Sequence, residues 1–166
     1  MKRNVSFATA AAAAAAATVA ALWLAVPAGA GARPAVSGTE NFQAVTSSAT
    51  SSTRSVIAYG VFTAGGVDHA GNKVDTFVFS NGTFKVAHSK GTGKPTLNPK
   101  TCLFTATIHG TIALSGGTGA YKGISGKGTY QFSELAILAK SGGKCTMKKA
   151  PVAYQAIIKA TASVKL

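Results

Sequence analysis

The residues with the clearest chemical potential lie on two segments that we expect to form a hairpin. In "KVDTFVFSNGTFKVAHSK" the dipeptide Asn81-Gly82 separates two alternating runs, and Asn-Gly is a preferred two-residue loop of the type I′ turn. Such a loop sets the register, so that Asp75 would face His88 and Phe79 would face Phe84. A carboxylate beside an imidazole predicts general acid–base chemistry at this end of the hairpin.

A third titratable residue, Glu134, falls on the apolar face of another alternating run. In "TYQFSELAIL" the parity groups Glu134 with Tyr130 and Phe132, and it places Gln131 and Ser133 on the other face. A carboxylate on an apolar face is paired, hydrogen-bonded or raised in pKa, and these conditions are common at functional sites. Glu134 is therefore a further candidate for chemistry.

Two interpretations of these three groups follow. In the first, Asp75, His88 and Glu134 are catalytic groups at one mouth of an apolar barrel. The ligand-binding surface beside them would consist of Phe77, Phe79, Phe84, Tyr130, Phe132 and Tyr154. In the second, Asp75 and His88 form a solvated cross-strand pair, and Glu134 marks a bend at the rim. Ligand binding by a variant that lacks all three groups separates the two interpretations.

Other reaction classes lack a motif in this chain. His69, in the turn "GGVDHAGN", and His109, on a threonine-rich face, are expected at the surface. The spacing of histidines and carboxylates matches no metal site, and no serine sits in a G-x-S-x-G elbow. We therefore expect no metal and no cofactor.

The glycine-rich stretch "GGTGAYKGISGKGTY", residues 116–130, raises the question of a phosphate loop. Its spacing fits neither G-x-x-x-x-G-K-[ST] nor G-x-G-x-x-G. Both motifs also need a helix whose N-terminus receives the phosphate, whereas these glycines lead into a run with strand periodicity. The stretch therefore predicts a tight connection between two strands, with Tyr121 on the core and Lys122 and Lys127 in solvent.

The organisation expected around these residues is all-β. Period-two alternation dominates from Arg54 to Leu166, and no window there has a helical period. Seven or eight strands joined by short turns favour an antiparallel barrel, since closure removes exposed edges. We expect strands over residues 55–63, 73–80, 83–89, 101–109, 111–115, 127–139 and 152–165. The inward alanines near the C-terminus favour some space inside.

The segment "SGGTGAYKGISGKGTYQF" resembles the G-G-T-G-x-[FY]-x-G-x-x-G signature of the allene oxide cyclase and dirigent-like barrel superfamily, and especially secreted bacterial proteins with that barrel. The resemblance covers 18 residues directly and implies an eight-stranded antiparallel barrel. It further implies a small apolar ligand inside the barrel, cofactor-free cyclisation or coupling as a possible activity, and homo-oligomers. The glycine motif belongs to the scaffold, so it transfers no catalytic residue, and fold analogy alone does not carry an activity.

The N-terminus has the layout of a secretory signal peptide. A short basic head precedes an alanine-rich apolar run, and small residues follow that fit cleavage near Ala30 or Ala32. An uncleaved anchor is the alternative, since the run approaches the length that spans a bilayer. We expect residues 1–32 to be the signal, the Ser/Thr-rich residues 33–53 a flexible leader, and residues 54–166 the barrel of a secreted protein.

Two cysteines, Cys102 and Cys145, are the only ones in the chain. An even count in an exported protein predicts one structural disulfide. A redox pair would require C-x-x-C spacing, and a metal site would require further ligands nearby. The disulfide would close a loop whose loss of chain entropy stabilises the fold by about 4 kcal/mol.

The charge of the chain is strongly basic. It holds 17 Lys and Arg against 4 Asp and Glu, a net charge of +13, of which the signal would remove two positive charges. Such a protein is attracted to polyanionic surfaces, such as a wall polymer or an anionic membrane. The basic residues are almost all lysine and the aromatic residues face inward, so we expect no specific nucleic-acid recognition.

Overall fold

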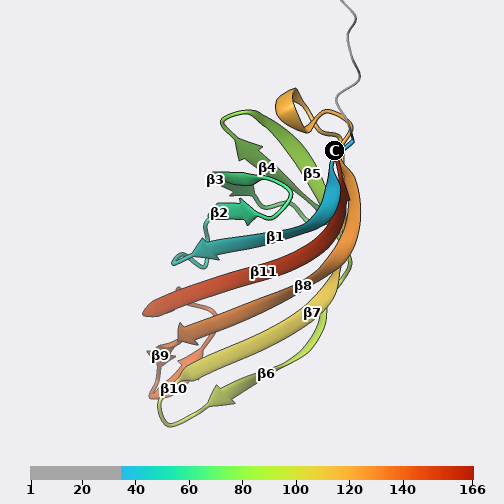
Figure 1. Cartoon of the computed structure of the whole chain (residues 1–166). Helices are drawn as coiled ribbons and strands as arrows, with labels where there is room; N and C mark the ends of the chain where they lie inside the picture. Colours follow the sequence, from blue (N-terminus) through green and yellow to red (C-terminus); the bar gives the residue numbers. More distant parts are fainter. Residues whose placement is uncertain (1–34) are drawn as a thin grey trace, which may run out of the picture. The chain divides into compact units, whose positions relative to one another are not determined.

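Strands make up almost all of the regular structure in this computed structural model, which describes residues 35–166 (Figure 1). They are β1 (Ser37–Thr46), β2 (Thr53–Tyr59), β3 (Thr63–His69), β4 (Val74–Phe79), β5 (Gly82–His88), β6 (Thr92–Asn98), β7 (Leu103–Ser115), β8 (Ser125–Ile137), β9 (Ala139–Ser141), β10 (Lys144–Thr146) and β11 (Ala153–Lys165). A short 3-10 helix, η1 (Gly119–Tyr121), joins β7 to β8. The predicted signal peptide lies outside the described residues.

Eight strands close into an antiparallel barrel in the order β5-β4-β3-β2-β1-β11-β8-β7, with β7 pairing back onto β5. The predicted all-β, antiparallel eight-stranded barrel is therefore confirmed. Residues 112–115 of β7 pair with β5, whereas residues 103–109 of the same strand pair with β6. The sheet thus continues beyond the barrel closure, and β9 and β10 form a separate hairpin near its far end (Figure 1).

The expectation of a flexible leader over residues 33–53 is wrong for residues 37–46. Residues 37–46 form β1, which lies between β2 and β11 and completes the barrel wall. Alternate side chains of this strand, Glu40, Phe42 and Ala44, are buried. Without β1 the edges of both neighbours would be unpaired, which is the physical reason that it is ordered. The Ser/Thr-rich residues that suggested a leader lie mainly in the loop that follows β1.

The β4–β5 hairpin forms, but its predicted register is shifted by two residues. Phe77 pairs with Phe84 and Asp75 with Val86, so the loop is Ser80-Asn81. The peptide oxygen of Thr118 lies where a β-carbon of residue 82 would stand, so only glycine fits there as the first residue of β5. A shift of two preserves parity, and each side chain therefore keeps its predicted face.

The glycine stretch connects β7 to β8 as predicted and closes one end of the barrel. Ala120 N–H donates to the Asn81 carbonyl at 2.8 Å, which docks the stretch on the β4–β5 turn. Gly117 has no space for a β-carbon because the Tyr121 carbonyl lies against it. Tyr121 is buried and contacts the rings of three phenylalanines, while Lys122 and Lys127 are exposed. These rings belong to Phe62, Phe79 and Phe84.

The predicted disulfide is present at the other end of the long strands. The sulfurs of Cys102 and Cys145 lie 2.06 Å apart, and the bond ties the β6–β7 turn to β10. Cys102 is buried with Ala136 and Leu138 in a small satellite core. Among residues 35–166, no helix has the length and apolar character required to cross a bilayer.

Candidate functional site

The barrel interior opens into a cavity of about 900 Å³ beyond the aromatic end. This volume lies in the range of sites that hold a small molecule. Of the inward alanines near the C-terminus that predicted some space, Ala160 lines the cavity, and Ala44 on β1 lines it as well. Apolar side chains of β7, β8 and β11, namely Ile108, Phe132 and Ile158, form one wall.

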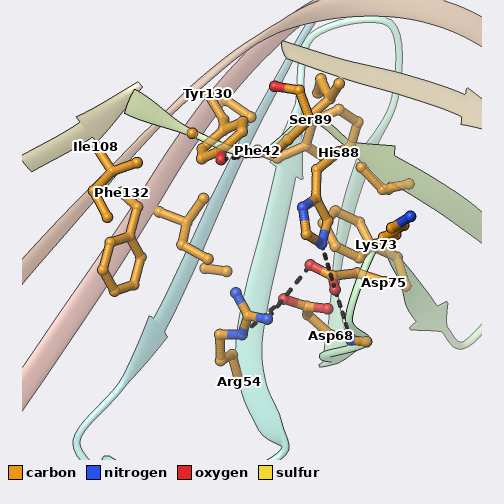
Figure 2. A pocket seen from close by; sticks show the side chains of 18 of the residues that line it. Phe42, Arg54, Asp68, Lys73, Asp75, His88, Ser89, Ile108, Tyr130 and Phe132 are labelled. Atoms are coloured by element: carbon orange, nitrogen blue, oxygen red, sulfur yellow. Dashed lines mark hydrogen bonds and ion pairs between the residues drawn. The ribbon is translucent and has the colours of Figure 1, made fainter. Parts of the chain in front are cut away.

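Four of the charged or polar side chains that line the cavity are joined by ion pairs on the opposite wall, and we call them the charged cluster: Arg54, Asp68, Asp75 and His88. They come from β2, β3, β4 and β5, and β3 is four strands from β8 in the eight-stranded order. Figure 2 shows the side chains of Arg54 and His88 pointing toward the two carboxylates, with Ile108 and Phe132 apart from them. The cavity is therefore amphipathic.

Arg54 holds the cluster together. Its Nε lies 3.1 Å from Oδ2 of Asp68, its direct partner on the neighbouring strand, and Nη2 lies 3.4 Å from Oδ2 of Asp75. The other oxygen of Asp75 accepts a hydrogen bond of 2.8 Å from the Gly71 N–H. His88 Nε2 lies 3.5 Å from this same Oδ1. The guanidinium of Arg54 thus forms ion pairs with both carboxylates, and the carboxylate of Asp75 also lies beside the imidazole of His88.

Asp68 is the most unusual member of the charged cluster. It lines the cavity but is only 1% exposed, and its Oδ1 accepts no hydrogen bond from any residue in the described part of the chain. Burial raises the pKa of this carboxyl to about 7. Arg54 and His88 oppose that rise in pKa and Asp75 adds to it. At neutral pH the carboxyl is therefore present in both protonation states, so it can donate or accept a hydrogen bond.

His88 also contacts Tyr130, another residue that lines the cavity. Its ring meets that of Tyr130 edge-on, with centroids 6.3 Å apart. Tyr130 Oη donates to the Ser89 carbonyl at 3.2 Å, which holds the β5–β6 connection against β8. The imidazole is a quarter exposed, so it is the member of the cluster nearest to solvent. Asp75, in contrast, is 8% exposed and pairs directly with Val86, so Asp75 and His88 do not form the solvated, directly opposed pair of the second interpretation.

The structure brings together some of the predicted site residues and separates others. Asp75 and His88 line the cavity together with three of the predicted ligand-binding residues, Phe77, Tyr130 and Phe132. Phe79 and Phe84 are instead packed in the aromatic core behind the cavity. Glu134 and Tyr154 do not line it. The predicted grouping of Glu134 with Asp75 and His88 is therefore not formed.

Glu134 lies farther along β8, where its neighbours across the sheet are Ala106 and Ala156. It is half-buried, and burial raises the pKa of its carboxyl. Burial, followed by the charge of Glu134, also raises the pKa of Tyr154. The apolar-face assignment of Glu134 agrees with this burial, but its position along the strand removes it from the charged cluster.

The sequence reasoning missed Arg54 and Asp68. Arg54 shares its parity with the buried Val56 and Ala58, which was a usable signal. Asp68 was assigned to a turn because glycines precede and follow it, although residues 63–69 form β3. His69 and His109 are exposed, as predicted. Residues 35–166 contain no group of three or more His, Cys, Asp or Glu side chains arranged to hold a metal ion.

No protein-family model, curated protein or solved structure matches this chain.

Proposed function

We propose that this protein binds a small, largely apolar molecule carrying a single polar group. The observation that carries the proposal is the amphipathic cavity, with an apolar wall facing a buried carboxyl whose Oδ1 is unsatisfied within the described residues. A buried polar atom without a partner is costly, and a ligand hydroxyl or carbonyl at Asp68 would remove that cost. The apolar body of the ligand would contact Ile108 and Phe132.

The resemblance of the glycine stretch to the allene oxide cyclase and dirigent-like superfamily supports the same proposal, because characterised members act on apolar molecules inside the barrel. We propose that the protein works outside the cell. The disulfide supports export, since disulfides persist in oxidising compartments.

A cavity-filling variant tests binding. The probe is 2-naphthol, a rigid apolar body with one hydroxyl, and naphthalene is the matched probe without it. Ala160→Trp should abolish binding of both, because Ala160 lines the cavity, whereas Ala153→Trp on the exposed face of β11 should leave binding unchanged. Titration calorimetry gives the affinities and circular dichroism checks the fold. Equal affinity of Ala160→Trp and the unmodified protein would contradict the proposal.

A variant in the charged cluster tests the polar contact in the same experiment. Arg54→Met should weaken 2-naphthol binding about tenfold and leave naphthalene binding within a factor of about two, since only the hydroxyl meets the charged cluster. An equal loss for both probes would show that Arg54 only maintains the shape of the cavity.

A cofactor-free isomerase or cyclase is the second candidate, and the pKa of Asp68 favours it. A carboxyl with a pKa of about 7 that lines an amphipathic cavity can take a proton from a carbon beside a carbonyl and return it at neutral pH. The test is deuterium exchange at the α-carbon of 2-tetralone, followed by mass spectrometry. Exchange should rise as the pH passes through about 7 and should be lost in Asp68→Asn at saturating ketone. Equal deuterium exchange in Asp68→Asn and the unmodified protein would contradict catalysis by Asp68 and leave only the binding function.

A further inference from the structure

The two most exposed large apolar side chains among the described residues lie in one lysine-rich segment. They are Met147 and Val152, at 67% and 75% exposure, in the part of the chain that follows β8. Exposed lysines accompany them in the same segment, at 140, 144, 148 and 149. Such a segment places positive charge and apolar surface side by side in solvent.

The disulfide gives this segment a fixed position. Cys145 on β10 is bonded to Cys102 at the end of the β6–β7 turn, and this turn carries the exposed Lys100. We call residues 99–102 and 139–152 together the basic lobe. In Figure 1 its elements, β9 and β10, lie at the end of the sheet away from η1. The basic lobe contains no acidic residue, and Glu134, the nearest one in sequence, is half-buried on β8.

We infer that the basic lobe docks on the surface of an anionic lipid bilayer. The lysines match the charge of the head groups, and each lysine near such a surface adds to the affinity. Met147 and Val152 would enter the boundary between head groups and acyl chains, where exposed apolar side chains gain burial. A soluble polyanion would satisfy the lysines but leave both apolar side chains in water, so the combination favours lipid. This inference does not depend on ligand binding in the barrel.

Vesicle sedimentation with the whole protein tests the inference. The probes are vesicles of phosphatidylcholine alone, vesicles containing 30% phosphatidylglycerol, and long-chain polyphosphate. Binding is expected to the anionic vesicles and not to vesicles of phosphatidylcholine alone, and it should fall steeply between 50 and 300 mM salt. Lys148→Gln with Lys149→Gln should lower the partition coefficient about 30-fold. The matched control, Lys122→Gln with Lys127→Gln near the glycine stretch, should lower it less than threefold.

The apolar contribution has its own variant. Met147→Ser with Val152→Ser keeps every charge and should lower binding to anionic vesicles about tenfold without changing any binding to polyphosphate. Polyphosphate binding without vesicle binding would overturn the inference in favour of a soluble polyanion. Equal losses in the two lysine pairs would also overturn it, because net charge rather than the basic lobe would then be responsible. Absence of binding to all three probes would remove it altogether.

Discussion

The strands β4 and β5 contribute aromatic side chains to one end of the barrel interior and charged or polar side chains to the other. Toward the glycine stretch, β4 and β5 contribute Phe79 and Phe84, which pack with other aromatic rings at centroid distances of 5.3–6.3 Å. Toward the cavity, the same strands contribute Asp75 and His88. The packed aromatic rings at one end stabilise the barrel. The cavity end can therefore hold polar groups that contribute little to the stability of the barrel.

Each end also contains one fully buried acid, and these two acids, Glu40 and Asp68, differ in their partners. Glu40 is fully buried, and its Oε2 accepts a hydrogen bond of 3.0 Å from the Phe62 N–H. Its Oε1 has no partner in the described part of the chain, and no ion pair to Glu40 is found there. Asp68 instead pairs with Arg54 and lines the cavity. A carboxyl beside a cavity can be used by a ligand, whereas one behind the aromatic rings acts on stability alone.

The strongest test of this contrast compares one phenylalanine from each end. Phe84→Ala should lower the free energy of unfolding by about 4 kcal/mol, because Phe84 is fully buried among aromatic rings. Phe132→Ala should cost about 1 kcal/mol, since this side chain already borders open space. Urea denaturation measures both. Similar losses at the two positions would mean that the cavity end also carries the stability of the barrel.

The two buried acids predict a common dependence on pH. Burial raises the pKa of both Glu40 and Asp68, so the folded protein binds protons more tightly than the unfolded chain. Their stabilisation is complete below about pH 4 and is lost as the pH rises toward 7, by about 4 kcal/mol for Asp68. Asp68→Asn and Glu40→Gln should each flatten this slope in denaturation measured from pH 4 to 8. A wild-type stability that rises over this range would contradict the assignment.

Ligand binding also distinguishes Asp68 from Glu40. Asp68→Asn should change the affinity for 2-naphthol, whereas Glu40→Gln should alter stability without altering binding, because Glu40 does not line the cavity. Loss of binding in Glu40→Gln would show that the two ends of the interior are coupled.

A smaller effect is expected from the glycine stretch that closes the aromatic end. Gly117→Ala should lower the free energy of unfolding by about 2 kcal/mol, because the new β-carbon would meet the Tyr121 carbonyl and displace the ring. Gly65→Ala, on β3, meets no atom within 4 Å and is the matched control. Thermal unfolding should therefore separate the two variants. A neutral Gly117→Ala would show that the stretch adapts and does not hold Tyr121 in place.

The sequence predicted faces more reliably than positions along strands. Asp75 and His88 share a face as expected, although the register between their strands shifted by two residues. Glu134 also falls on the expected face, but it does not line the cavity with them. Arg54 and Asp68 were missed because their role depends on the pairing of β2 with β3, and glycines obscured β3 as a strand. β1 was missed because its buried face carries Glu40 and Ala44 beside a single large apolar residue, Phe42, and because a Ser/Thr-rich loop follows it.

The amino-acid sequence by itself determined the all-β class, the alternation of faces along the predicted strands, the disulfide partners and the role of the glycine stretch as a connection. These properties follow from local backbone geometry, since a pleated strand alternates its side chains whatever its neighbours are. Only the tertiary structure decided which side chains meet at one height inside the barrel. That height depends on barrel closure through β1, on the pairing of β5 with β7, and on the packing of the glycine stretch against the β4–β5 turn. Each of these contacts joins residues far apart in the chain, so no local pattern specifies them.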